Sequence, residues 1–279
     1  MMKKISLLFI FLILICTTIL SGCTKPESTD VMLKSSITED ADIRWETIIE
    51  NGVINVGIKV QDLPYIEKKN NDSYNGFLID FTDAVAKKAG VKANYIEIDA
   101  ENVPALLTDN TIDVVINGYS EADVSNIQLK WLQPYITSNC IIVCKNNSEI
   151  KEKSDLSGKI TGVVDDTLSH ITAVNDGNIN NDDIIKYDNE QDAINALNSK
   201  KIDALVIDGL HFYYHCKYNL GNYKILDEIV HTDTLSFGIN KTNVKLGEEL
   251  QKIITELSTD GTIEDISKKW FGKSSTLIK

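Results

Sequence analysis

The chain has 279 residues, of which 43% are hydrophobic, 25% charged and 7% aromatic. These proportions are typical of a globular protein and exclude a disordered or collagen-like chain. A formal net charge of -13 argues against nucleic acid as a partner, because phosphate binding needs a basic surface. The length allows one large domain or two of roughly 130 residues each. Arg44 is the only arginine, so any site that needs a bidentate guanidinium must use it.

The N-terminal segment has the pattern of a signal peptide. Lys3 and Lys4 precede an apolar run that extends from Ile5 to Ile15. A transmembrane anchor is the alternative, but the run is shorter than the roughly 20 apolar residues that a span requires. We therefore expect residues 1–22 to be removed on export.

The four residues Leu20-Ser21-Gly22-Cys23 resemble the lipobox of bacterial lipoproteins. The resemblance implies a lipid on Cys23 that anchors the protein to the cell membrane from the extracytoplasmic side. Residues 23–43 are polar and without periodicity, and we expect them to form a tether.

Three cysteines remain beyond the lipobox: Cys140, Cys144 and Cys216. Because three is an odd number, at least one thiol must stay free. Cys140 and Cys144 flank a strand-like segment that would place them roughly 13 Å apart, too far for a disulfide. We expect them to be packing residues.

From Arg44 onward, strand-like and helix-like segments alternate. In the first half the predicted strands are 53–60, 95–98 and 112–117, and the predicted helices are 80–88 and 103–107. In the second half the predicted strands are 160–164, 184–187 and 202–207, and the predicted helices are 190–198 and two others that begin at 167 and 210. This alternation predicts an α/β fold with mostly parallel sheets.

An internal echo indicates two similar lobes, because residues 105–118 are matched by residues 196–209. In open α/β sheets, ligands bind beyond the carboxyl ends of the strands. That rule selects the residues that follow two of the predicted strands: Asn117, Gly118, Tyr119, Asp208 and Gly209. For Asp208 the alternative is a cap on the next helix.

Short motifs follow one another along most of the chain, and each is weak by itself. They lie at residues 52–57, 64–65, 76–81, 112–118, 131–135, 155–159, 202–208, 237–239 and 260–272. Taken in this order, they resemble the family 3 extracellular solute-binding proteins of bacterial ABC importers over about residues 45 to 272.

The resemblance implies a two-lobed α/β fold, the periplasmic-binding-protein type II fold, in which a double-crossing hinge lets the lobes close on a small solute. Carried over, lobe 1 comprises residues 44–140 and 239–274, and lobe 2 comprises residues 141–238. The crossings fall near Ile141 to Lys145 and Thr234 to Ile239. The implied partners are a small solute and an ABC permease in the membrane. We expect a monomer without a cofactor.

The family's binding residues carry over only in part. Tyr65 matches the aromatic residue that stacks on the solute, and Asp208 matches the aspartate that pairs with an α-ammonium group. The arginine that clamps an α-carboxylate is replaced by Ser125, and the glycine of the Gly-Thr-Thr helix start is replaced by Asp166. The candidate ligand-binding residues are Asp62, Tyr65, Asn117, Gly118, Tyr119, Ser120, Ser125, Asp166, Thr167 and Asp208.

This departure from the family pattern predicts a solute with a positive amine that does not depend on an arginine-held carboxylate. Tyr65 and Tyr119 can stack on a cation, and four acidic residues add attraction: Glu121, Asp123, Asp165 and Asp166. The alternative is that Lys130 or backbone N–H groups replace the arginine and an ordinary amino acid binds.

Other chemistry has weaker support. His211 and His215 have the i, i+4 spacing of zinc ligands, but no third ligand is evident, so we interpret this segment as a half-exposed aromatic helix and expect no metal. Ser169-His170 lacks a nucleophile-elbow motif. Two further functions stay open on the same fold: a sensor or interaction receptor, and a dehydratase-like enzyme that uses one of the four acidic residues. A transport receptor without enzyme activity is the preferred interpretation.

Overall fold

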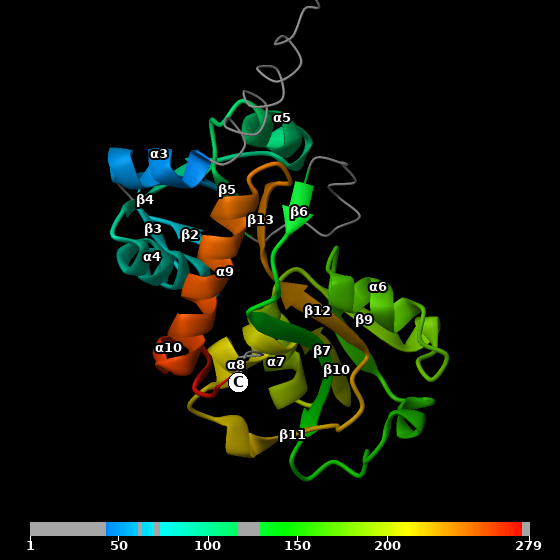
Figure 1. Ribbon diagram of the computed structural model, residues 1–279. Helices are drawn as coiled ribbons and strands as arrows, with labels where there is room; N and C mark the ends of the chain where they lie inside the picture. The colour runs from blue at the N-terminus through cyan, green and yellow to red at the C-terminus, as the bar shows by residue number, and fades with distance from the viewer. Residues whose placement is uncertain (1–42, 61–62, 70–72, 117–128, 275–279) are drawn as a thin grey trace, which may run out of the picture. The chain divides into compact units, whose positions relative to one another are not determined.

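The computed structural model describes residues 43–60, 63–69, 73–116 and 129–274, and the statements below concern these residues (Figure 1). The first described helix is α3 (Arg44–Asn51), at the position where the sequence predicts the folded part to begin. Within these ranges, no helix has both the length and the apolar character needed to cross a membrane.

The first sheet has the strand order β4-β1-β5-β13-β6. Its strands are β1 (Val53–Ile58), β4 (Lys92–Glu97), β5 (Val114–Ile116), β6 (Leu129–Trp131) and β13 (Phe237–Asn240). The helices of this part of the chain are α3, α4 (Phe77–Ala89), α5 (Val103–Thr108), α9 (Val244–Thr259) and α10 (Thr262–Phe271), with the short turn η1 (Ala100–Asn102) and the strand pair β2 (Glu67–Lys68) and β3 (Tyr74–Asn75). We call this part the first lobe.

The second sheet has the strand order β11-β7-β10-β8-β9, and β12 pairs with β7. Its strands are β7 (Ile136–Lys145), β8 (Thr161–Val164), β9 (Ile184–Tyr187), β10 (Ala204–Asp208), β11 (Tyr223–Ile225) and β12 (His231–Leu235). The helices are α6 (Leu168–Val174), α7 (Glu190–Asn198) and α8 (Gly209–Cys216), with the short turns η2 (Lys153–Leu156), η3 (Asn181–Asp183) and η4 (Leu220–Asn222). We call this part the second lobe.

The internal echo in the sequence corresponds to a repeated arrangement. The order β4-β1-β5-β13 in the first sheet has the same sequence of parallel, parallel and antiparallel pairings as β9-β8-β10-β7 in the second. Asp113 and Asp203 hold similar places, because each carboxylate accepts a backbone N–H at or next to the neighbouring strand. The donor to Asp113 is Asn55, in β1, at 2.7 Å, and the donor to Asp203 is Ile160, just before β8, at 3.0 Å. The internal sequence repeat therefore reflects similar strands and, in addition, an aspartate that links each of the two strands to its neighbour.

Each sheet is mixed, which corrects the prediction of mostly parallel sheets. The parallel pairs involve β1, β4 and β5 in one sheet and β8, β9 and β10 in the other. The antiparallel pairs come from β6, β7, β11, β12 and β13. The alternating pattern indicates strands joined by helices, as is typical of parallel pairs. It does not indicate that β7 and β13 each enter a sheet from the other lobe and pair antiparallel there.

The chain changes from the first sheet to the second between Trp131 and Ile136, and returns between Leu235 and Phe237. The return lies within the predicted segment Thr234 to Ile239. The predicted first crossing, Ile141 to Lys145, lies inside β7, which runs unbroken from Ile136 and is almost entirely buried. The two crossing segments are hydrogen-bonded to each other, from Tyr135 N to Leu235 O at 3.0 Å and from Leu132 N to Phe237 O at 2.8 Å.

Packing accounts for the cysteines. Cys140, Cys144 and Cys216 are all free thiols and all buried, which confirms the interpretation of Cys140 and Cys144 as packing residues.

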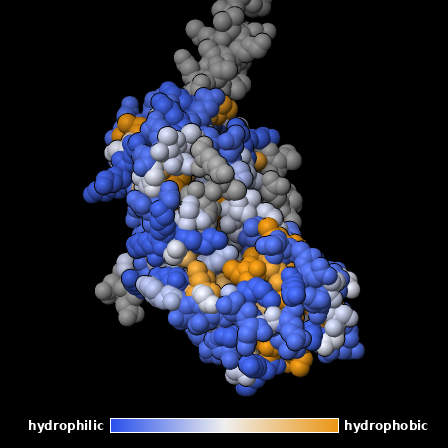
Figure 2. All heavy atoms as spheres, turned by 90° about the horizontal axis from the view of Figure 1, so that it is seen from below, coloured by the Kyte–Doolittle hydropathy of each residue, from blue (hydrophilic) through white to orange (hydrophobic). Residues whose placement is uncertain are grey.

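Hydrophilic residues dominate the face seen in Figure 2, and apolar ones gather in a few patches.

Candidate functional site

The candidate site lies where the two lobes contact each other at the ends of their strands. The Tyr65 hydroxyl, from the first lobe, lies 3.3 Å from Oδ1 of Asp208 and 3.2 Å from the Ser138 hydroxyl. Asp208 ends β10 and Ser138 lies on β7, so both belong to the second sheet. The Ser138 hydroxyl also donates to Oδ2 of Asp208. Tyr65, Ser138 and Asp208 thus form one hydrogen-bonded group, which we call the Tyr65–Asp208 cluster.

The start of α4 holds Tyr65 in place. The backbone N–H groups of Phe77 and Leu78 donate to the carbonyls of Pro64, at 2.7 Å, and Tyr65, at 3.3 Å. Gly76, at the N-cap of α4, has a φ of 145°, and a Cβ at this position would lie 2.0 Å from the Tyr65 carbonyl oxygen. Only glycine permits both this backbone conformation and this close approach.

Asp208 caps α8, as the alternative interpretation of the sequence predicts, and its carboxylate also contacts the first lobe. Its carboxylate is the N-cap of α8 and accepts the His211 N–H at 2.9 Å, and the same carboxylate faces Tyr65. Burial raises the pKa of Tyr65 well above its ordinary value, and the Asp208 charge raises it further, so the phenol stays protonated and donates. A carboxylate has about four acceptor positions, of which these contacts use three. A cationic amine can therefore bind at the fourth or replace one of the hydroxyl donors.

The start of α6 carries the other two described candidates. Asp166 is exposed and has a left-handed φ of 55°, a conformation in which glycine is favoured and aspartate is tolerated. The Thr167 hydroxyl caps α6 by accepting the His170 N–H at 3.3 Å. The turn before α6 thus has a left-handed residue at its first position, and that residue carries a negative charge.

Asp165 is engaged in ion pairs rather than available as a base. Its carboxylate lies 3.0 Å from His170 Nδ1 and 3.1 Å from Lys186 Nζ. The hydrogen bond from Lys186 is the main reason that the pKa of Asp165 is lowered. This arrangement gives no support to Asp165 as the base of a dehydratase-like enzyme.

The only arginine has a structural partner. The Arg44 guanidinium pairs with the buried carboxylate of Asp113 and donates to the Asn110 carbonyl at 3.1 Å. Burial raises the pKa of Asp113, and the Asn55 N–H and Arg44 only partly offset that effect. Asp113 precedes β5, whereas Tyr65 follows β1, a parallel strand of the same sheet, and Asp208 is the last residue of β10. Arg44 is thus held at the opposite end of the strands from the candidate site.

Several predicted residues lie outside the described part of the chain: Asp62, Asn117, Gly118, Tyr119, Ser120, Ser125, the acidic Glu121 and Asp123, and the lipobox residue Cys23. Their predicted roles stay predictions. Sequence reasoning missed Ser138, because a serine on a buried strand has no motif around it. It also missed Glu190, which lies beside His211 and starts a different helix, α7.

Comparison with known proteins identifies the family. The model of the bacterial extracellular solute-binding proteins, family 3, matches residues 54–273. The chain is 26% identical over 238 residues to the L-cystine-binding protein TcyA of Bacillus subtilis, covering 84% of this chain and 87% of that protein. It is 25% identical over 215 residues to the arginine-binding extracellular protein ArtP of Bacillus subtilis, covering 75% of this chain and 83% of that protein.

Solved structures agree with this assignment. The substrate-binding protein of a polar amino acid ABC uptake transporter from Streptococcus thermophilus is similar with a TM-score of 0.75 and 25% identity, over 84% of this chain and 91% of that one. An ancestral cationic amino acid solute-binding protein is similar with a TM-score of 0.69 and 25% identity, over 81% of this chain and 99% of that one. The fold is the two-lobed periplasmic-binding-protein type II fold, and the chain belongs to the bacterial extracellular solute-binding proteins, family 3.

Proposed function

We propose that this protein is the lipid-anchored, extracytoplasmic receptor of an ABC importer, and that it captures a small amine-bearing solute between its lobes. The observation that carries the proposal is the Tyr65–Asp208 cluster, in which a carboxylate of the second lobe faces an aromatic residue of the first. A carboxylate and an aromatic ring are the two groups that bind an ammonium ion best, by charge-assisted hydrogen bonds and cation–π contact.

The position of Arg44 supports a solute that does not rely on an arginine-held carboxylate. Arg44 is committed to Asp113, and the family's clamp position carries Ser125 in this sequence. A buried carboxylate without its partner costs on the order of 3 to 5 kcal/mol. At about 1.4 kcal/mol per tenfold change, that cost corresponds to roughly 10²- to 10⁴-fold weaker binding. The exposed charge of Asp166 at the start of α6 adds repulsion against an anionic solute.

Calorimetry with the mature chain against a panel of solutes tests this specificity. We expect arginine, polyamines and other amines to bind in preference to glutamate and aspartate. Binding of glutamate or aspartate at micromolar concentration, with no heat from the amines, would contradict the proposal. Equal binding of neutral and basic amino acids would instead support Lys130 or backbone N–H groups as a replacement for the missing arginine.

Anchoring is tested separately by fractionating cells that express the full chain. Cys23→Ser removes the only lipidation position that the lipobox offers, so we expect the protein to leave the membrane fraction. Thr24→Ala, at the next residue, is the matched control and should stay membrane-bound. Membrane retention of the Cys23→Ser protein at the wild-type level would show that the anchor is something else.

A further inference from the structure

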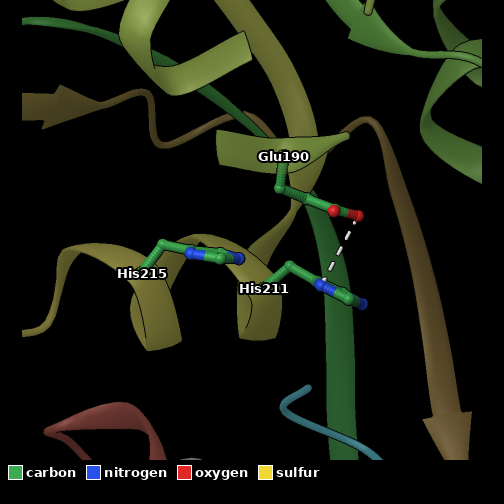
Figure 3. A group of neighbouring side chains, drawn as sticks. All are labelled: Glu190, His211 and His215. Carbon is green, nitrogen blue, oxygen red and sulfur yellow. Dashed lines mark ion pairs between the residues drawn. The ribbon is translucent and has the colours of Figure 1, made fainter. Parts of the chain in front are cut away.

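Three side chains with metal-binding atoms converge at the start of α7 and on α8 (Figure 3). His211 and His215 lie on successive turns of α8, and Glu190 is the first residue of α7. One ligand atom from each of the three lies within 4.8 Å of the other two. Glu190 supplies the third ligand that the i, i+4 histidine pair lacks in the sequence.

The contact between Glu190 and His211 has the spacing of two metal ligands. Oε1 of Glu190 lies 3.5 Å from Nδ1 of His211, beyond a good hydrogen bond. Two atoms that bind the same tetrahedral zinc ion at about 2.0–2.1 Å lie roughly 3.3 Å apart. The pair is therefore almost at the separation that a shared ion requires.

Nδ1 of His211 is also a buried polar atom without a hydrogen-bond partner among the described residues. The side chains of His211 and Glu190 are only 14% and 17% exposed. A buried nitrogen that neither donates nor accepts costs free energy unless another interaction compensates. A cation between the nitrogen and the Glu190 carboxylate would satisfy both groups.

We propose that Glu190, His211 and His215 bind a divalent transition-metal ion of the zinc type. Two imidazoles and one carboxylate form the donor set of three-ligand zinc sites, which leave the fourth position to water or to a small ligand. Hard ions such as Mg²⁺ or Ca²⁺ are disfavoured because they select oxygen ligands. A pair of ligand atoms 4.8 Å apart would have to close by about 1.5 Å to share an ion, which small side-chain rotations of these partly buried residues can supply.

The proposed metal site adjoins the Tyr65–Asp208 cluster. The His211 ring meets the Tyr65 ring edge to face, with 5.1 Å between the centroids, and the backbone N–H of His211 donates to Asp208. The metal would thus lie one helical turn from the proposed amine site. Tyr65, a first-lobe residue, would contact His211, one of the metal ligands. The site is independent of the identity of the solute and of the proposed transport role.

Titration of the full mature chain with Zn²⁺ and with Co²⁺ tests the proposal. The protein carries no histidine tag, is stripped with a chelator and is examined in the absence of solute. We expect one ion per chain by calorimetry, and a Co²⁺ absorption spectrum with the intense visible bands of a tetrahedral site but without a thiolate charge-transfer band. His215→Gln and Glu190→Gln should each weaken binding by at least about 100-fold, since even outer-shell changes cost 10- to 100-fold.

The chain offers matched controls in its two other histidines, His170 and His231. His231→Gln changes an exposed residue of β12 outside the cluster and should leave Zn²⁺ affinity unchanged. Circular dichroism of each metal-free variant establishes that it is folded. Absence of binding up to millimolar Zn²⁺, or equal loss of binding in the cluster variants and in His231→Gln, would overturn the proposal.

Discussion

The hydroxyl of Tyr65 lies 3.3 Å from a carboxylate oxygen of Asp208, and these residues belong to different lobes. They are separated by 143 positions in the sequence. The contact joins the two groups that the family resemblance assigns to an aromatic platform and an ammonium partner. It also shows that the Asp208 carboxylate has protein donors around it, so that an incoming amine competes with hydroxyl groups for the same oxygens.

Asp208→Asn should weaken binding of a cationic solute with little loss of stability. Asparagine keeps the N-cap of α8, because asparagine and aspartate cap helices about equally well. It removes the charge, and a hydrogen bond to a charged group is worth about 1.5–3 kcal/mol. We expect roughly 10- to 100-fold weaker binding by calorimetry, with a melting temperature close to that of the wild type.

The matched control is Asp203→Asn, which removes one negative charge immediately before the first residue of β10. Asp203 accepts the Ile160 N–H and precedes the first residue of β10, whereas Asp208 is the last. Its substitution should leave solute affinity unchanged. If both variants lost affinity equally, the effect would come from net charge, and Asp208 would not be the ammonium partner.

Gly76→Ala should disturb the position of Tyr65. The added Cβ would lie 2.0 Å from the Tyr65 carbonyl oxygen, and φ at this residue is 145°. We expect a destabilisation of at least about 2 kcal/mol in denaturant unfolding, together with weaker solute binding. Gly177→Ala is the control, because nothing lies within 4 Å of a Cβ there, and it should be neutral or slightly stabilising. Unchanged stability of Gly76→Ala would show that the loop around Tyr65 adapts freely.

Asp166→Asn should shift specificity toward solutes that carry a carboxylate. Asparagine tolerates the left-handed φ of 55° as well as aspartate does, so the turn before α6 should persist. Removing the charge should lower the affinity for a cationic amine and raise that for a neutral amino acid, each by a few-fold at low ionic strength. Asp182→Asn, at an exposed site in η3, changes the net charge equally and should have no such effect. Identical changes of affinity in both variants would show that the effect comes from the net charge of the protein and not from the position of Asp166.

The buried cysteines should resist alkylation in the folded protein. Burial raises the pKa of Cys140 to about 11 and that of Cys144 to about 11, and it also raises the pKa of Cys216. At pH 8 a thiol with a pKa of 11 is a thiolate in roughly one molecule in a thousand, and only the thiolate reacts. Peptide mapping after iodoacetamide treatment should find these three residues unmodified until denaturant is added. Rapid modification of any of them at pH 8 would show that it is reached without unfolding.

Much of the fold could be predicted because local patterns determine it. The strand at 184–187 and the helix at 190–198 agree with the structure residue for residue, since Asn189 caps α7 and β9 is bounded by polar turns. The antiparallel strands could not be predicted in the same way. Nothing near β7 or β13 in the sequence specifies which sheet each one joins, because their partners lie far along the chain.

The candidate site could be predicted only where a residue stands in a motif. Asp208 and Tyr65 follow recognisable strand and loop patterns, and the structure brings them together. Ser138 and Glu190 are found by geometry alone, since a serine on a strand and a glutamate at a helix start are common without any ligand. Side-chain convergence across elements is a tertiary property that no single segment encodes.

The two crossing segments between the lobes are paired strands, which limits the relative movements that the lobes could make. β7 and β12 pair continuously from His231–Cys140 to Leu235–Ile136, and the ladder continues through Tyr135 and Leu132 into the first sheet. Two strands that are hydrogen-bonded along their length resist sliding past each other and separating. They can still bend or twist together as one unit. Insertion of one residue beside Ser236 would shift the register of the two strands and, under the proposed function, should weaken the link between solute binding and closure of the lobes.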